Sequence, residues 1–183
     1  MIYPQIDAPL GTNHGIASLA GVLHANGHEL DLMHVSEKYK PVPSSQEIIE
    51  YIRETKPGLV GFSVMSQQME WVEEKSKDIR EVIPELVQVI GGVHCTMVPD
   101  EVHKSKMFDY VCVGEGDWAL LELMDSLEKG KTPHTLANFR SWMGGVPVSN
   151  PVAPFPDLEK LPPLDLSLIH ISEPTRPRLI SYA

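Results

Sequence analysis

Four loops of this chain carry small and polar residues directly after short apolar segments, and a ligand could approach the backbone there. The loops are 7–14, 63–67, 91–96 and 114–117, and three of the four are rich in glycine, serine or threonine. Glycine lets the main chain lie against a bulky ligand and permits positive φ in sharp turns. Each loop alone is explained by a tight strand-to-helix turn, but all four on one rim favour a binding surface.

The side chains in these loops support binding better than catalysis. His14 and His94 each fit a hydrogen-bonded loop histidine, and Glu115 fits a carboxylate favoured at a helix N-terminus. The two cysteines, Cys95 and Cys112, are interpreted as packing residues and cannot form a four-thiolate metal site. We therefore predict no catalytic residue and no metal ligand in this chain.

The segments around the loops alternate between strand-like and helix-like patterns. Strands are predicted over 1–3, 29–35, 59–64, 87–90 and 110–113. Helices are predicted over 14–25, 66–83, 99–104 and 115–129, with another that is capped by Ser44 or Ser45 and broken at Pro57. This alternation implies an α/β, three-layer α/β/α domain of flavodoxin-like (Rossmann-like) type. Its doubly wound parallel sheet should have five strands in the order 2-1-3-4-5.

The pattern changes after Gly130. Residues 139–142 and 146–148 flank Gly144-Gly145 and predict a small β-hairpin, and 150–164 form a proline-rich connector. We divide the chain into an α/β domain over 1–130, a hairpin and linker over 131–165, and a tail over 166–183.

The tail LSLIHISEPTRPRLISYA shows no clear periodicity. Its back-translation resembles the transposase end and adapter sequences used to prepare DNA libraries, so we interpret 166–183 as non-native and exclude it from the fold. This interpretation predicts a gene interrupted after Asp165 and a tail that does not pack on the domain. A natural proline-rich tail is the alternative.

Composition limits the partners. The chain has 183 residues, 42% hydrophobic, and a net charge of −10, which argues against nucleic acid and anionic membranes. No apolar run approaches the ~20 residues of a membrane helix, and no signal peptide is recognisable at the start. We expect a cytoplasmic location.

Six motifs follow one another in a specific order and spacing. They are Pro9-Leu10-Gly11, Ala25-Asn26-Gly27-His28-Glu29, Lys56-Pro57-Gly58-Leu59-Val60-Gly61-Phe62-Ser63, Gly91-Gly92-Val93-His94-Cys95-Thr96, Pro99-Asp100-Glu101 and Gly114-Glu115-Gly116-Asp117. Together with the connector, they make 9–164 resemble the cobalamin-binding domain that precedes the catalytic barrel in B12-binding radical SAM proteins.

The resemblance implies cobalamin as cofactor, with its nucleotide tail in the crevice at the carboxyl edge of the sheet. Ser63 with Met65 resembles a Ser-x-Leu element whose hydroxyl would meet the tail. Gly91-Gly92 would let the tail lie against the backbone, and Leu10-Gly11 and Gly114-Glu115 would flank the corrin. The implied cofactor-binding residues are Leu10, Gly11, Thr12, Ser63, Met65, Gly91, Gly92, His94, Gly114 and Glu115.

In this family the catalytic barrel holds the [4Fe-4S] cluster on three cysteines and binds S-adenosylmethionine. Two cysteines at this spacing cannot supply that motif. The resemblance therefore implies that this fragment binds cobalamin and that a following barrel of the same chain reacts, by methyl transfer, ring formation or another radical step.

One departure bears on the cobalt. Other cobalamin domains use Asp-x-His-x-x-Gly, whose histidine ligates the metal, but Thr12 and Ala17 stand at the flanking positions around His14. A histidine at the lower cobalt face is therefore not expected. The alternative function is a cofactor-free scaffold or interaction domain of a radical SAM protein.

Overall fold

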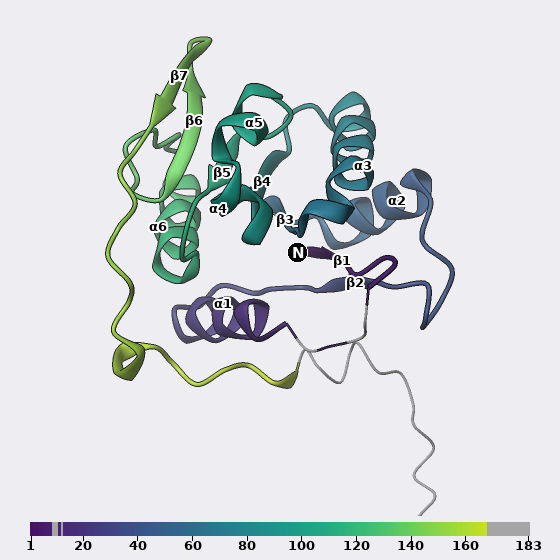
Figure 1. The fold of residues 1–183 in the computed structure, drawn as a ribbon, viewed down its shortest axis with the longest axis horizontal. Coiled ribbons are helices and arrows are strands. Elements are labelled where there is room, and N and C mark those ends of the chain that lie inside the picture. Colours follow the sequence, from purple (N-terminus) through teal and green to yellow (C-terminus); the bar gives the residue numbers. More distant parts are fainter. Residues whose placement is uncertain (9–10, 12, 168–183) are drawn as a thin grey trace, which may run out of the picture.

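The computed structural model of the chain describes residues 1–8, 11 and 13–167. Its centre is a sheet in the order β2-β1-β3-β4-β5-β6-β7 (Figure 1). The strands are β1 (Ile2–Pro4), β2 (Met33–Val35), β3 (Leu59–Ser63), β4 (Val87–Gly91), β5 (Tyr110–Cys112), β6 (Phe139–Met143) and β7 (Val146–Ser149). β1 to β5 are parallel, and β6 and β7 are antiparallel to their neighbours. The predicted α/β class and the order of the first five strands are confirmed.

Helices cover both faces of the sheet. The α-helices are α1 (His14–Ala25), α2 (Ser45–Thr55), α3 (Met69–Val82), α4 (Val93–Met97), α5 (Pro99–Lys104) and α6 (Asp117–Glu128), with 3-10 turns η1 (Ser66–Gln68) and η2 (Leu158–Lys160). One core cluster joins the sheet to α1 and α6 through residues such as Leu23 and Leu123. The other joins it to α2, α3 and α5 through residues such as Ile48, Val72 and Val102. The predicted three layers are therefore present.

Local sequence explains the start of α2. Ser44 caps it, its side chain accepting a hydrogen bond from the Glu47 N–H while the Glu47 carboxylate accepts one from the Ser44 N–H. This capping box satisfies two backbone donors that helix geometry leaves free. The prediction left Ser44 and Ser45 open, and the structure selects Ser44.

The predicted sheet of five strands is wrong in its extent, because the hairpin joins it and makes seven. β6 pairs with β5, with Tyr110 opposite Ser141 and Cys112 opposite Phe139. Without that pairing, β5 would leave a row of unpaired N–H and C=O groups at the sheet edge. The hairpin signal in the sequence was local and contained no information about this partner.

Most other boundaries differ from the prediction by one or two residues, and two segments differ by more. β2 covers only Met33–Val35 of the expected 29–35, because β1 is three residues long and pairs Ile2 with Met33 and Pro4 with Val35. The expected helix over 66–83 starts as the 3-10 turn η1 and becomes α-helical at Met69, and no side chain caps its first turn.

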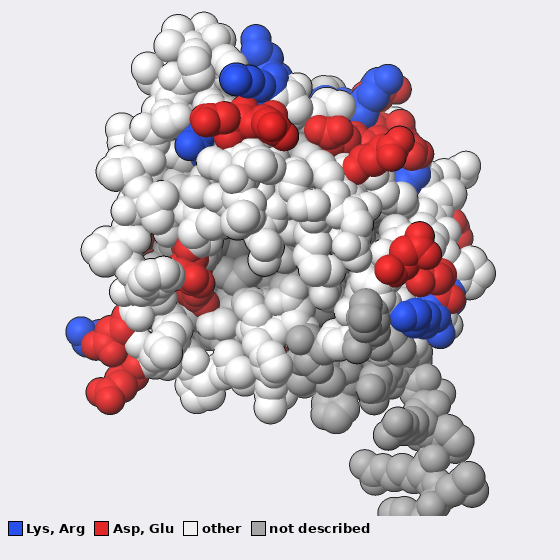
Figure 2. All heavy atoms as spheres, in the orientation of Figure 1, with Lys and Arg blue, Asp and Glu red and all other residues white. Residues whose placement is uncertain are grey.

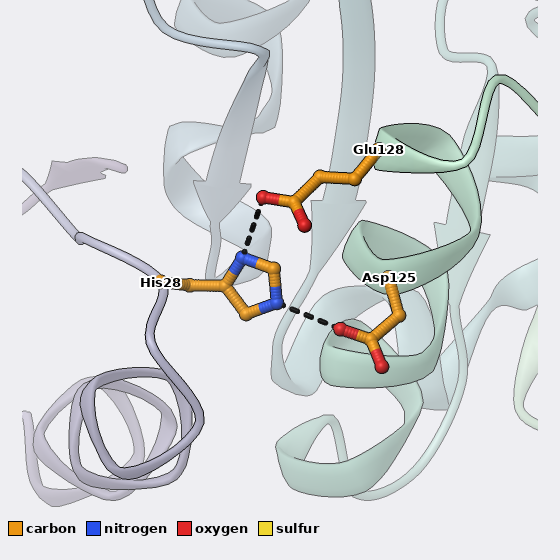
Figure 3. A group of neighbouring side chains, drawn as sticks. All are labelled: His28, Asp125 and Glu128. Carbon is orange, nitrogen blue, oxygen red and sulfur yellow. Dashed lines mark hydrogen bonds and ion pairs between the residues drawn. The ribbon is translucent and has the colours of Figure 1, made fainter.

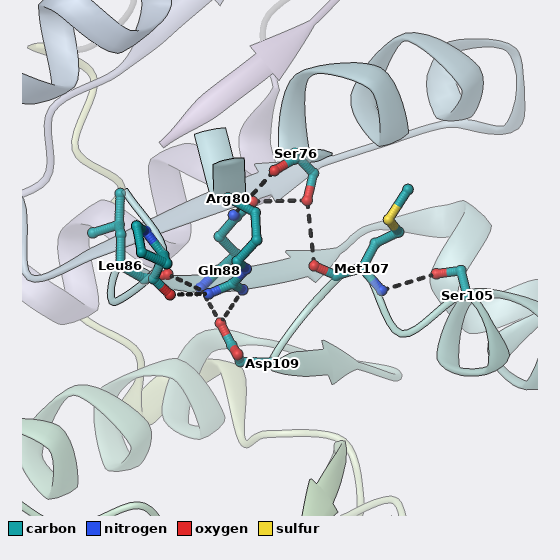
Figure 4. A network of polar contacts seen from close by, with 8 residues as sticks. Ser76, Arg80, Leu86, Gln88, Ser105, Met107 and Asp109 are labelled. Atoms are coloured by element: carbon teal, nitrogen blue, oxygen red, sulfur yellow. Dashed lines mark hydrogen bonds and ion pairs between the residues drawn. The ribbon is translucent and has the colours of Figure 1, made fainter. Parts of the chain in front are cut away.

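A partly buried polar network fixes α3 to the strand that leads into the glycine pair (Figure 4). The hydroxyl of Ser76 donates to Gln88 Oε1 at 2.7 Å. Asp109 accepts from Arg80 Nη2 at 2.6 Å and from the Gln88 N–H at 2.7 Å. Gln88 lies on β4, so these bonds hold the helix, β4 and the segment before β5 in one position.

The connector returns to α1. The Asp165 N–H donates to the Ala17 carbonyl at 2.9 Å, and its carboxylate lies 2.6 Å from His24 Nδ1. A Cβ on Gly21 would approach the Pro163 carbonyl oxygen to 2.3 Å, so only glycine fits below the connector. Residues 168–183 of the tail lie outside the described residues, and the prediction that the tail does not pack stays a prediction. Within the described part of the chain, no helix is long and apolar enough to cross a bilayer.

Candidate functional site

The loops after β3 and β4 meet at the carboxyl edge of the sheet. Ser63 is paired in register with Gly91. Beyond that pair, the Val64 N–H donates to the Gly91 carbonyl at 3.0 Å, and the His94 N–H donates to the Val64 carbonyl at 3.3 Å. Two of the four loops predicted to converge on one rim therefore meet there. The roles of their side chains toward a ligand stay predictions.

Gly92 makes this junction possible. It has φ of 105° and ψ of −173°, a conformation open essentially to glycine alone. A Cβ at this position would lie 2.7 Å from the Val64 carbonyl oxygen and 2.8 Å from its nitrogen. The two loops can thus approach so closely only because no side chain stands between them.

The helix α4 connects the glycine pair with the next loop, and the sequence analysis did not predict it. Thr96 Oγ1 donates to the Gly92 carbonyl and accepts from the Gly114 N–H at 3.1 Å. His94 Nδ1 lies 2.9 Å from the Ser66 hydroxyl, which ties α4 back to η1. A five-residue helix has too few turns to show a periodic pattern, so only the preceding Gly-Gly could have indicated it.

The loop after β5 is shaped by the connector. Gly114 has φ of 83°, and a Cβ there would lie 3.0 Å from Val152 Cγ1. The Glu115 carbonyl accepts from Asn138 Nδ2 at 2.6 Å, while the Glu115 residue is exposed. Both predicted residues are therefore on the rim, beside a segment that the sequence analysis had counted as linker.

The first loop is described only in part. Leu10 and Thr12 lie outside the described residues. Gly11 is exposed, and a Cβ on it would lie 3.9 Å from Gln5 Nε2. Met65 is half-buried in the loop between β3 and η1, and His14 is exposed at the first position of α1.

The face that these loops form has a hollow and is largely apolar. Figure 2 shows the hollow near the centre of the view, between α1, α4 and α6, with acidic side chains on the α6 side and most other charges toward the margins. Large apolar side chains at this edge are exposed, Val93 by 65%, Met97 by 73% and Val152 by 56%. Such a surface suits a large ligand with an apolar face.

The thiols near this edge do not add reactivity. Burial raises the pKa of both Cys95 and Cys112 to about 12. Both thiols are therefore protonated near neutral pH, and the thiolate is the form that attacks or ligates. The interpretation of both as packing residues agrees with this environment.

A histidine of the resemblance motifs lies at the opposite edge of the sheet, together with the two carboxylates of α6 shown in Figure 3. His28 is buried, with Nε2 2.8 Å from Asp125 Oδ1 and Nδ1 3.3 Å from Glu128 Oε1. It lines a cavity of about 450 Å³ at the amino ends of β1 and β3. The two ring nitrogens point to different carboxylates, so the cluster joins the turn after α1 to α6.

Comparison with known proteins agrees with this fold. Residues 8–124 match the B12 binding domain, and the chain belongs to that family. The solved structure of the cobalamin-dependent S-adenosylmethionine radical enzyme OxsB with aqua-cobalamin superposes with a TM-score of 0.71 at 18% identity, covering 93% of this chain and 25% of that chain. The radical S-adenosylmethionine methyltransferase TsrM from Kitasatospora setae, with tryptophan and a SAM analogue bound, gives 0.70 at 18%, covering 82% and 29%. These likenesses concern the fold.

Curated relatives are much longer than the chain. An anaerobic magnesium-protoporphyrin IX monomethyl ester cyclase of Rubrivivax gelatinosus is 30% identical over 117 residues, 63% of this chain and 21% of the relative. A cytidylyl-2-hydroxyethylphosphonate methyltransferase of Streptomyces wedmorensis is 30% identical over 139 residues, 68% of this chain and 25% of the relative. The chain thus spans between a fifth and a quarter of these relatives.

Proposed function

We propose that this chain binds cobalamin at the carboxyl edge of its sheet and serves as the cofactor-binding module of a B12-dependent radical SAM enzyme. The observation that carries the proposal is the junction of the loops after β3 and β4. There Gly92 has a conformation that only glycine readily adopts, and its missing side chain lets the Val64 backbone approach closely. This junction stands at the edge where ligands of open parallel sheets bind, in a chain of the B12 binding domain family.

The residues at this edge fit the group. Gly91 and Gly92 give backbone access, and Ser63 lies opposite Gly91 in the sheet register and so brings a hydroxyl group to this edge. Val93 and Met97 are exposed apolar side chains next to the glycine pair, suited to cover part of a corrin face. Bound cobalamin would supply the cobalt centre, and the chain's residues would hold it and exclude water.

Catalysis would belong to a following barrel that binds the [4Fe-4S] cluster and S-adenosylmethionine. The only two cysteines of the chain are buried thiols, which supports placing the cluster elsewhere. The reaction of the complete protein would be methyl transfer or ring formation, the two activities that the names of the curated relatives carry. A cytoplasmic location fits its unpaired cysteines.

Titration with aquacobalamin tests the binding. The chain is mixed with the cofactor at increasing ratios, and the corrin absorption spectrum and the unfolding temperature are recorded. We expect a saturable spectral change at one equivalent and a rise in the unfolding temperature with cofactor concentration. An unchanged spectrum and unfolding temperature would refute the proposal and favour a cofactor-free scaffold.

A further inference from the structure

The strand order places a crevice between β1 and β3. From β1 the chain passes through α1 to β2 on one side, and β3, β4 and β5 follow on the other side. In doubly wound sheets, ligands bind at this point of reversal, beyond the carboxyl ends of the two strands. The residues that bridge the ends of β1 and β3 are therefore the first to examine for a ligand contact.

Gln68 forms such a bridge. It is the last residue of η1, directly after the β3 loop, and its Nε2 donates to the Ile6 carbonyl beyond β1 at 3.2 Å. The residue is 1% exposed. Its other polar atom, Oε1, has no hydrogen-bond partner within the described part of the chain.

A buried acceptor without a partner is uncommon in folded proteins and needs an explanation. Here the Nε2 bond fixes the plane of the amide, so Oε1 is oriented and cannot turn away without losing that bond. Oε1 is itself shielded from solvent in the chain without a ligand. A ligand donor that enters between the ends of β1 and β3 and displaces the groups covering Oε1 would therefore meet one preoriented acceptor.

Resting on the proposed cobalamin binding, we propose that Gln68 Oε1 accepts a hydrogen bond from one of the primary amide side chains of the corrin. Those amides are the N–H donors that cobalamin carries around its ring. The contact makes Gln68 a residue that selects the amidated corrin, because a carboxylate in place of that amide has no N–H to donate and places two acceptors opposite each other.

Monocarboxylate derivatives of cobalamin, each with one side-chain amide hydrolysed to an acid, test this inference. Affinities of the parent chain for cobalamin and for each derivative are measured by absorbance titration. We expect one derivative to bind at least about tenfold more weakly than the others, because a buried acceptor facing a carboxylate is both unpaired and repelled. Equal affinity for all derivatives would overturn the inference without any variant.

Gln68→Met then identifies the residue. It keeps the size of the side chain and removes the acceptor, and Gln67→Met is the matched control because Gln67 is its exposed neighbour. We expect Gln68→Met to bind cobalamin about fivefold more weakly and to lose the discrimination among derivatives, which a purely structural role would leave intact. A folded Gln68→Met variant with unchanged discrimination would refute the assignment. Failure of the parent to bind cobalamin would refute the proposed function itself.

Discussion

Replacing Gly92 with alanine tests the junction on which the candidate site depends. The native φ of 105° and ψ of −173° cost a residue with a Cβ about 1–3 kcal/mol. The new Cβ would also stand 2.7 Å from the Val64 carbonyl oxygen, a rigid backbone atom. We therefore expect a loss at the upper end, about 3 kcal/mol. For a chain of this length, that lowers the unfolding temperature by about 6–12 °C.

Two other glycines separate the contributions. Gly27 has φ of 87° but no atom within 4 Å of a built Cβ, so Gly27→Ala carries the conformational cost alone, about 1 kcal/mol. Gly58 has neither a positive φ nor a close neighbour, and Gly58→Ala should change stability by less than about 1 kcal/mol in either direction. Thermal and urea unfolding of the three variants should rank Gly92 as the most sensitive. If Gly92→Ala unfolds at the same temperature and urea concentration as Gly58→Ala, the described junction is wrong.

The same effect should reach the ligand. At a temperature where Gly92→Ala remains folded, its affinity for cobalamin should fall, because the Cβ pushes the β4 loop away from Val64. Gly27→Ala, at the opposite edge of the sheet, should bind as the parent does. Loss of affinity in both variants to the same extent would mean that the site at the carboxyl edge is wrongly placed.

Further results are expected for the site side chains, the two cysteines and the tail. Ser63→Ala should weaken cobalamin binding about fivefold in a titration, because losing one neutral hydrogen bond costs ~1 kcal/mol. In the same titration, His14→Ala should leave the affinity within twofold of the parent. Burial raises the pKa values of Cys95 and Cys112 from 9.0 to about 12, so the protonated thiols stabilise the fold below pH 9 and that contribution is lost as pH rises from 9 toward 12. Urea unfolding across this range should show the free energy of unfolding decrease. Thiol reagents at pH 8 should react only with unfolded chain. Deleting 166–183 should leave the unfolding temperature unchanged, and a drop of several degrees would indicate that the tail packs on the domain.

Much of the site could be predicted because its residues directly follow strands, and those strands are recognisable in the sequence as short apolar runs. The apolar runs before Ser63 and Gly91 identified buried parallel strands, and parallel strands have their carboxyl ends on one edge. The order of the motifs then identified the family that the match over residues 8–124 shows. None of this required knowledge of which side chains touch.

The sequence by itself determined the alternation of strands and helices, a helix start at Ser44 or Ser45 and the edge on which the loops gather, because each depends on residues close together in the chain. The tertiary structure decided the rest. The hairpin joined β5, β2 shortened to match β1, and Gly92 met Val64, because partners far apart in sequence set these contacts. Gln68 shows the difference most clearly. Its residue type and position predict only a polar side chain after a strand, whereas the fold buries that side chain and leaves Oε1 without a partner among the described residues.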